Sequence, residues 1–247
     1  MKIVHISDTH GPKGHTPVTV PPCDVLIHSG DIGGRTNLFE LTEFLIWFEK
    51  QPATKKIWIA GNHDLILDSD WVNRKKKEMD SVAGMILEQQ HSQVQGILNA
   101  YNVTYLKDSE CVVDGVKFYG SPYTPSFHRA HWAFNADRGK EITKIWAKIP
   151  SDTNVLITHG PVYGILDEVE KKYLSLGEDK HRGCTDLLNV IKSRLFDLQL
   201  HCSGHIHDNV GITLKAVSNR RRVLFSNGAV LTNDYTQLIT KPLIIEI

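Results

Sequence analysis

The chain opens with Lys2-Ile3-Val4-His5-Ile6-Ser7-Asp8-Thr9-His10, in which an apolar run ends in polar side chains. Its β-branched residues predict a strand over 2–7. A short apolar strand followed directly by a polar cluster recurs four more times, at Gly30-Asp31, Gly61-Asn62-His63-Asp64, Thr158-His159-Gly160-Pro161 and Gly204-His205-Ile206-His207. Ligands of α/β proteins bind beyond the carboxyl ends of strands. We therefore expect five strand ends to converge on one site.

The remaining pattern alternates strands and helices without an obvious linker. We predict strands over 24–29, 56–60, 154–158, 198–203, 223–226 and 243–247, and helices over 38–50, 136–149 and 185–194, the last capped by Thr185. Residues 70–100 have helical periodicity, and 111–119 form a hairpin about a type I′ turn at Asp114-Gly115. This alternation predicts one α/β domain over 1–247, with sheets that are not purely parallel.

Composition excludes several classes of protein. The 28 Lys and Arg balance 28 Asp and Glu, and a dedicated nucleic-acid binder normally carries a basic excess. No apolar run approaches the length of a membrane span, and His5 and Asp8 interrupt any signal sequence. The four cysteines are scattered, so we expect reduced thiols and a cytoplasmic protein. His5 and His28 lie within predicted strands and are expected to be core residues.

The polar clusters contain the donors of a two-metal centre. Asp8 and Asp31 offer anionic oxygens and Asn62 a neutral carbonyl oxygen, while the imidazoles come from His10, His159, His205 and His207. Mixed nitrogen and oxygen donors without cysteine suit manganese, iron, zinc or nickel. Because only two carboxylates face two divalent ions, the centre keeps a net positive charge that favours a phosphate substrate.

The complete set of clusters resembles that of the calcineurin-like metallophosphoesterases: D-x-H, G-D, G-N-H-[DE], T-H-G and G-H-x-H, in this order. Residues 6–10, 59–64, 120–123, 156–161 and 241–244 are also similar to a branch of metallophosphoesterase-domain-containing proteins related to class III cyclic-nucleotide phosphodiesterases. The resemblance implies a four-layer αββα sandwich of two mixed β-sheets flanked by helices. Its dimetal site would lie at the carboxyl ends of the strands.

The resemblance also implies roles for the site residues. Asp8, His10, Asp31 and His207 would hold one metal ion, and Asp31, Asn62, His159 and His205 the other, with Asp31 bridging. Manganese is the favoured metal. A hydroxide activated by both ions would attack phosphorus in line with the leaving oxygen. His63 would assist the phosphate or the leaving group, and Asp64 would hydrogen-bond His63 and fix its tautomer.

The substrate pocket is less specific in the sequence. Residues 121–132 are rich in aromatics and histidine, and either stack a nucleobase or plug the core. The candidates there are Tyr123, Phe127 and Trp132. Residues 181–184 and Asn227 are weaker pocket candidates.

The expected partner is a small phosphate ester, with a nucleotide favoured, and the expected reaction is phosphodiester hydrolysis, with cyclic nucleotides as the favoured substrates. A phosphomonoesterase or protein phosphatase on the same centre is the alternative. A DNA nuclease is disfavoured by the charge balance. A non-catalytic scaffold is disfavoured because every ligand and His63 are present.

Overall fold

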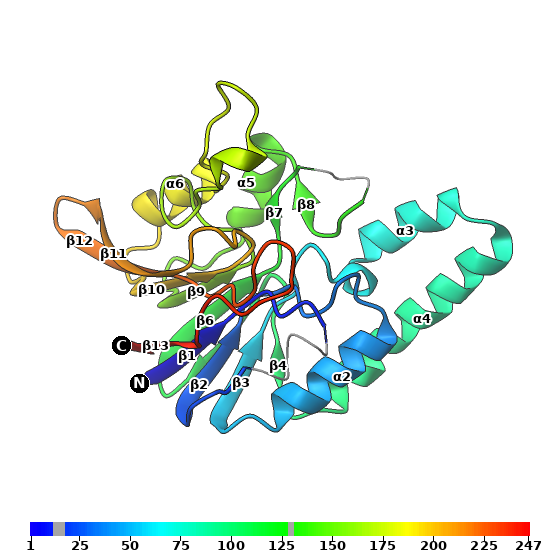
Figure 1. The fold of residues 1–247 in the computed structure, drawn as a ribbon. Coiled ribbons are helices and arrows are strands. Elements are labelled where there is room, and N and C mark those ends of the chain that lie inside the picture. Colours follow the sequence, from blue (N-terminus) through cyan, green and yellow to red (C-terminus); the bar gives the residue numbers. More distant parts are fainter. Residues whose placement is uncertain (12–17, 128–130) are drawn as a thin grey trace.

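The computed structural model describes residues 1–11, 18–127 and 131–247, and its centre is a pair of facing β-sheets (Figure 1). The first sheet has the order β13-β1-β2-β3-β4. Its strands are β1 (Lys2–Ile6), β2 (Cys23–His28), β3 (Ala53–Trp58), β4 (Thr104–Tyr105) and β13 (Leu243–Glu246). Strands β1 to β4 are parallel, and β13 is antiparallel to β1. The first sheet is therefore mixed, as expected.

The second sheet has the order β11-β12-β10-β9-β6-β5. Its strands are β5 (Ser109–Val113), β6 (Val116–Ser121), β9 (Val155–Thr158), β10 (Leu200–Ser203), β11 (Gly211–Ser218) and β12 (Arg221–Asn227). The inner four are parallel, while β5 and β11 are antiparallel edges. A separate short pair joins β7 (Thr124–Pro125) to β8 (Asn135–Ala136).

Helices cover the outer face of each sheet (Figure 1). The first sheet carries α2 (Leu38–Glu49) and the end of α4 (Ser81–Asn99), while α3 (Ser69–Glu78) and the start of α4 project beyond the sheet. The second sheet carries α5 (Lys140–Trp146) and α6 (Thr185–Ser193). Two short 3₁₀ helices are η1 (Leu65–Leu67) and η2 (Lys171–Tyr173). The resulting order of layers, helix–sheet–sheet–helix, confirms the predicted αββα sandwich. None of the described helices is long and apolar enough to cross a membrane.

The two-residue period of the strands divides the core into three clusters. Ile3 and Ile27 point between the sheets, where they meet Phe118 and Ile157 of the second sheet. The alternate residues of the first sheet pack under α2, and those of the second pack under α5 and α6. The strands of the parallel centre are thus largely apolar on both faces, and the polar clusters identified in the sequence follow the strand ends.

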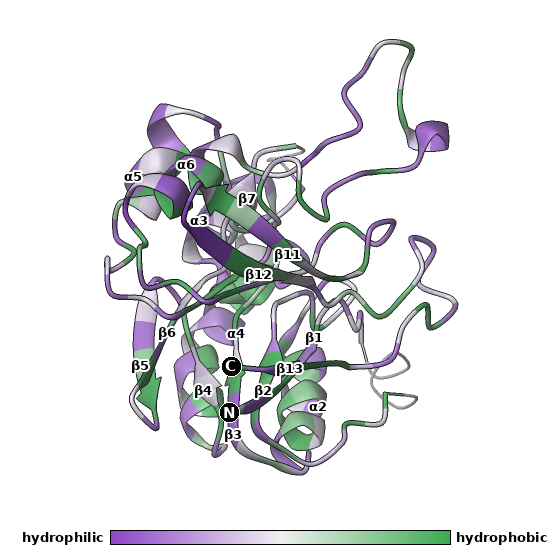
Figure 2. Ribbon diagram, turned by 90° about the vertical axis from the view of Figure 1, so that its left-hand side faces the viewer, coloured by the Kyte–Doolittle hydropathy of each residue, from purple (hydrophilic) through white to green (hydrophobic). Residues whose placement is uncertain are grey.

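The chain ends meet on the first sheet. The amino group of Met1 donates to the carbonyl of Ile247 at 2.6 Å, and the Ile247 amide donates back to Met1. Figure 2, turned by 90° from Figure 1, shows both ends beside β13. Strand β13 therefore closes the edge of the sheet next to β1.

Several predicted boundaries are correct, and the hairpin turn is confirmed. Asp114 has φ 49° and Gly115 φ 80°, so both central residues adopt the positive φ that a type I′ turn requires. Helix α2 begins with a capping box in which Asn37 and Glu40 each accept from the backbone amide of the other.

Other boundaries differ from the prediction. Residues 70–100 form two helices, because Asp80 caps a new helix by accepting from the amides of Val82 and Ala83. The helix predicted over 136–149 is shorter, since β8 and Gly139, at φ 80°, precede its start at Lys140. Cys184, rather than Thr185, caps α6, with its sulfur accepting from the Leu187 amide. Strand β3 begins at Ala53.

Three histidines are structural residues of the core. His5 hydrogen-bonds to Ser226 and Ser29, and His28 to Thr9 and to the Gly30 amide. Both are fully buried, which confirms their predicted place in the core. His201 was not singled out in the sequence, but it is also buried, and burial lowers the pKa values of His5 and His201 to about 3.

We predict that His201 makes the fold sensitive to acid. The Thr158 hydroxyl donates to Gly160, so it accepts from Nε2–H of His201, at 2.8 Å. Below the ordinary pKa of 6.5 the unfolded chain gains a proton that the folded chain excludes until about pH 3. The free energy of unfolding therefore falls as the pH drops through this window, by at most about 1.4 kcal/mol per unit.

The test is urea unfolding of His201→Gln between pH 7 and pH 5. The glutamine amide can still donate to Thr158 but cannot take up the proton. We expect a shallower dependence of the unfolding free energy on pH than in the wild type. Equal slopes in the two proteins would contradict the assignment.

Candidate metal centre

Five loops bring the predicted ligands to one edge shared by both sheets. Asp8, Asp31 and Asn62 follow β1, β2 and β3 of the first sheet, and His159 and the His205–His207 loop follow β9 and β10 of the second. Asp8, Asp31, Asn62, His159 and His207 are buried. The predicted convergence of five strand ends is therefore what the structure shows.

The first group of donors is formed by Asp8, His10 and His207. Nε2 of His207 lies 3.3 Å from Oδ1 of Asp8, and Nε2 of His10 lies 3.9 Å from the same oxygen. The two imidazole nitrogens are 3.4 Å apart. Three atoms that can each donate a lone pair thus face one small volume.

The second group is formed by Asp31, His159 and His205, with Asn62 beside it. Nε2 of His159 lies 3.3 Å from Oδ2 of Asp31 and 2.9 Å from Oδ1 of Asn62. The same oxygen of Asp31 is 4.0 Å from Nε2 of His10, which belongs to the first group. Asp31 therefore belongs to the second group and also adjoins the first.

Hydrogen bonds to the backbone orient two of the imidazoles. Nδ1 of His159 lies 2.9 Å from the carbonyl oxygen of Ser29, and Nδ1 of His207 lies 2.7 Å from that of Leu231. A carbonyl oxygen can only accept, so Nδ1 carries the proton in both rings. Nε2 is then the atom that faces the centre and can bind a metal ion, which would displace a proton held there.

The backbone is strained at four of these residues. Asp8, His10, Asp31 and His205 have φ values of 56°, 48°, 56° and 68°. Residues other than glycine rarely adopt this left-handed conformation, and such strain concentrates at functional sites.

Two glycines leave the space that the ligands occupy. A Cβ atom at Gly61 would lie 2.6 Å from Cε1 of His159 and would overlap the carboxylate of Asp31. A Cβ atom at Gly204 would overlap the carboxylate of Asp8 and the hydroxyl of Ser7. Both positions therefore need glycine because of close approach, although neither has a positive φ.

The charges at the centre suit a cation. Burial raises the pKa of Asp31, but attraction to His159 and His63 outweighs it and holds that pKa well below the ordinary value. Burial lowers the pKa of His10 to about 4 and of His205 to about 3. Burial opposes protonation of His159 as well, yet Asp31 raises its pKa to about 9. His159 is therefore a cation beside Asp31, and a metal ion bound there would displace its proton. Ionised carboxylates together with imidazoles that stay neutral, such as His10 and His205, are a donor set that fits divalent metal ions.

A further observation supports this fit. Nδ1 of His10 is buried and has no hydrogen-bond partner among the described residues. Its Nε2 atom faces Asp8, Asp31 and His207. A buried imidazole with so few hydrogen bonds is costly unless another partner uses its lone pair.

His63 lies at the centre, but its predicted partner is wrong. Nδ1 of His63 donates to the carbonyl oxygen of Gly34 at 2.5 Å, and Nε2 lies 4.0 Å from Oδ2 of Asp31. The carboxylate of Asp64 does not contact this ring. It accepts four hydrogen bonds instead, from the amides of Asp31, Ile32 and Gly61 and from the Thr36 hydroxyl.

Asp64 therefore positions the loops and does not orient His63. Burial, followed by repulsion from Asp31, raises the pKa of Asp64 to about 7, while the hydrogen bonds from Thr36 and Gly61 lower it. The tautomer of His63 is set by the Gly34 carbonyl. The sequence could not show this, because Asp64 is the immediate neighbour of His63 in the chain but turns away from it.

Aromatic rings surround the centre. The Trp132 ring lies 4.1 Å from that of His63, and the Phe127 ring lies 5.2 Å from that of His205, measured between centroids. The guanidinium of Arg35 lies 5.3 Å from the Trp132 centroid. Two of the three predicted aromatic residues thus border the site. Residues 128–130 of the same predicted segment lie outside the described residues.

Tyr235 is an aromatic residue of the site that the sequence analysis missed. Its ring centroid lies 4.0 Å from that of His10 and 5.6 Å from that of His207. The residue has φ 58° and is held in a turn closed by Asp234 and Thr232. The preceding Asn-Asp pair signals a turn, but nothing local shows that the turn folds over His10.

Tyr123 and Asn227 make structural contacts with the core and with neighbouring loops. Tyr123 packs edge-to-face on Phe134, at 5.7 Å, and lies between two core clusters. Asn227 is fully buried, and its amide nitrogen donates to the carbonyls of Leu166, Ile206 and Asn209. Its oxygen accepts from the Ala229 amide. We therefore correct the assignment of Asn227 to a pocket, because its polar atoms tie loops together.

Gly61→Ala is predicted to disrupt metal binding without removing any ligand, because the added methyl group displaces Asp31 and His159. Gly96→Ala is the matched control, since a Cβ atom at Gly96, within α4, meets nothing within 4 Å. Elemental analysis of the purified proteins should show metal loss in Gly61→Ala alone. Gly96→Ala should gain about 1 kcal/mol of stability from helix propensity. Wild-type metal content in folded Gly61→Ala would refute the prediction.

Comparison with known proteins shows which family this chain resembles. The family model for Metallophos, described as calcineurin-like phosphoesterase, matches residues 1–209. Metallophosphoesterase domain-containing protein 1 of Homo sapiens is 35% identical over 250 residues, which span 100% of this chain and 71% of that protein. A UPF0046 protein of Caenorhabditis elegans is 34% identical over 244 residues, spanning 99% of this chain and 74% of that protein.

A solved structure supports the fold alone. The crystal structure of TT1561 of Thermus thermophilus aligns with a TM-score of 0.51 at 10% identity, over 92% of this chain and 88% of that chain. The sequence matches carry the family assignment, because they extend across the five loops that form the centre. The chain belongs to the calcineurin-like phosphoesterase family.

Proposed function

We propose that the protein is a metal-dependent phosphodiesterase acting on small phosphodiesters of the nucleotide type, with cyclic nucleotides among them. Membership of the family implies a phosphoester hydrolase. The observation that carries the proposal is the placement of Asp31 in one donor group and beside the other, with Nε2 of His63 4.0 Å away. This arrangement offers two adjoining metal sites and a side chain that can transfer a proton.

The proposed ligands form two sets, one for each metal ion, which correspond to the two donor groups described above. Asp8, His10, Asp31 and His207 would hold one ion, and Asp31, Asn62, His159 and His205 the other. Manganese is our favoured metal for this mixed set of donors. Two divalent ions there would supply Lewis-acid polarisation of phosphoryl oxygens and an activated water.

His63 would act on the phosphate through Nε2. Because Nδ1–H is committed to Gly34, protonation can occur only at Nε2, and the imidazolium then donates from that atom. A donor at this position can stabilise charge on a phosphoryl oxygen or protonate the leaving oxygen. The Trp132 ring, packed on His63, limits the rotation of the imidazole.

The aromatic rings favour an ester with an aromatic substituent. Phe127 and Tyr235 are 43% and 46% exposed, and each ring lies next to a proposed metal ligand. Stacking on such rings suits a nucleobase. A phosphomonoester or a phosphoprotein would use the same centre without needing these rings.

The proposal is tested with bis-p-nitrophenyl phosphate and p-nitrophenyl phosphate, with and without manganese. We expect manganese-stimulated hydrolysis, with a higher kcat/KM for the diester. Asp31→Asn should lose both metal ions together, as measured by elemental analysis, and should lose activity with them. A preference for the monoester would favour the phosphatase alternative, and full metal occupancy in Asp31→Asn would refute the bridging role.

A second prediction separates His63 from Asp64. His63→Asn keeps a side-chain donor for the Gly34 carbonyl but has no proton to transfer, so kcat should fall by roughly 10²–10⁴-fold with the metals retained. Asp64→Asn should instead lower the melting temperature, because the amide cannot accept all four hydrogen bonds. If Asp64→Asn changed only the pH profile of kcat, with stability intact, Asp64 would be acting through His63 after all.

A further inference from the structure

Two hollows reach the metal centre, and they contain different charges. One, of about 450 Å³, is lined by His207, Asp208, Asp234, Glu170, Lys172 and Tyr173 among others; we call it the acidic hollow. The second, of about 540 Å³, is lined by His205, Phe127, Arg138, Arg182, Glu178 and Tyr173 among others; we call it the basic hollow. Both volumes are typical of ligand pockets.

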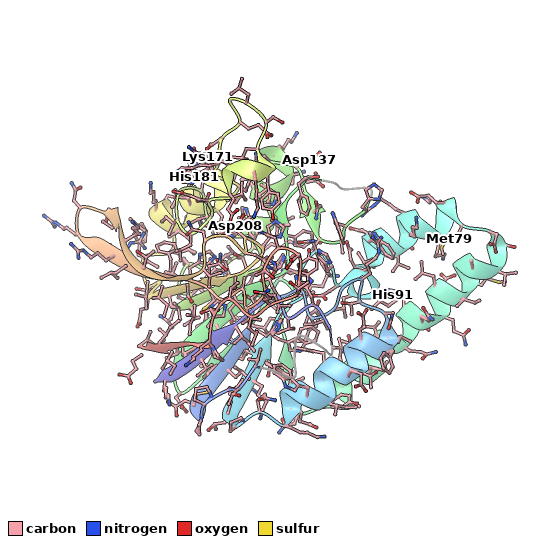
Figure 3. The ribbon with its side chains drawn as sticks, viewed as in Figure 1. Met79, His91, Asp137, Lys171, His181 and Asp208 are labelled. Carbon is pink, nitrogen blue, oxygen red and sulfur yellow. The ribbon has the colours of Figure 1, made fainter. Side chains whose placement is uncertain are left out.

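The acidic hollow is unfavourable for an anion. Its lysine, Lys172, is paired with Glu170 at 2.6 Å. Asp208 and Asp234 accept hydrogen bonds from neutral groups only, so their charges are not balanced by a cation among the described residues. Figure 3 labels Asp208, which directly follows His207 after β10. An anionic group placed here would meet two uncompensated carboxylates.

The basic hollow has the opposite character. Arg182 is paired with Glu178 at 3.2 Å. Arg138 has no carboxylate within 4.0 Å in the described part of the chain, and it donates at 2.8 Å to the carbonyls of Gly183 and Arg182. Those bonds fix the guanidinium but leave further N–H donors and the whole positive charge available. Arg138 follows Asp137, which Figure 3 labels on the segment between β8 and α5.

An aromatic surface lies between this charge and the metal centre. Phe127 lines the basic hollow and packs its ring against that of His205. A substrate with its scissile phosphate at the centre could therefore stack a ring on Phe127 and place a second negative group near Arg138 and Arg182. The opposite orientation would bring that negative group to Asp208 and Asp234.

From this asymmetry we infer that the basic hollow binds a second anionic group of the substrate, and that the substrate class is a nucleoside phosphodiester carrying a further phosphate. This inference rests on the proposed function, and it narrows that function beyond a cyclic nucleotide with a single phosphate. Arg182 lies in a segment that the sequence marked as a weak pocket candidate. Arg138 carried no sequence signal.

Binding is tested first, because it needs no turnover. The probes are thymidine 5′-monophosphate and thymidine 3′,5′-bisphosphate, titrated calorimetrically into the manganese-loaded protein. We expect the bisphosphate to bind at least about tenfold tighter, as one charge-assisted contact allows. Arg138→Gln and Arg182→Gln should each reduce this advantage to about threefold or less. Lys180→Gln is the matched control, because Lys180 lies on the same segment but pairs with Glu168 outside the hollow.

Turnover then separates this inference from the proposed function. The substrates are the p-nitrophenyl ester of thymidine 5′-phosphate and the same ester with a 3′-phosphate. An arginine-dependent preference for the 3′-phosphorylated form in both binding and kcat/KM supports the inference. Hydrolysis of both esters with no preference overturns it and leaves the phosphodiesterase intact. Arginine-dependent binding of the bisphosphate without hydrolysis of either ester supports the second-anion site and overturns the phosphodiesterase.

Discussion

The carboxylate of Asp64 joins the loops on which the metal centre depends. It is fully buried and accepts hydrogen bonds from the loop after β2, through Asp31, Ile32 and Thr36, and from the loop after β3, through Gly61. A buried carboxylate is costly unless its lone pairs are used, and here four donors use them. The same bonds fix the backbone of Asp31, whose own carboxylate accepts from the His63 amide. Displacement of either loop would therefore move Asp31 and the proposed proton donor together.

The histidines show why much of this site could be predicted from the sequence. Those within strands, such as His5, have both ring nitrogens satisfied by hydroxyls of the core. Those just beyond a strand end, such as His159, donate from one nitrogen to the backbone and turn the other toward carboxylates. Position relative to the end of an apolar run is a local property, so the sequence carries it. Because ligands of α/β proteins bind beyond the carboxyl ends of strands, the five polar clusters could be predicted to converge without knowledge of the strand order.

The parts that were not predicted depend on contacts between distant segments. No local pattern in the sequence links the residues involved. Asp64 binds the Asp31 amide, Tyr235 packs over His10, and the buried amide of Asn227 donates to Ile206. Strand β11 was missed because it is an exposed edge with an irregular pattern of burial. The cap of α6 was misplaced by one residue, because a cysteine sulfur is an unusual acceptor and Thr185 is a commoner cap.

The left-handed backbone at Asp8, His10, Asp31 and His205 also limits how this site can change during evolution. Aspartate, asparagine and histidine are the residues that tolerate this conformation most readily after glycine. Glutamate would keep the negative charge at Asp31, but it lacks the short side chain that eases the conformation. Mutational drift at these positions is therefore confined to a few residue types, and most of them can bind metal. The conformation of the main chain thus restricts which side chains, and so which chemistry, these four positions can carry.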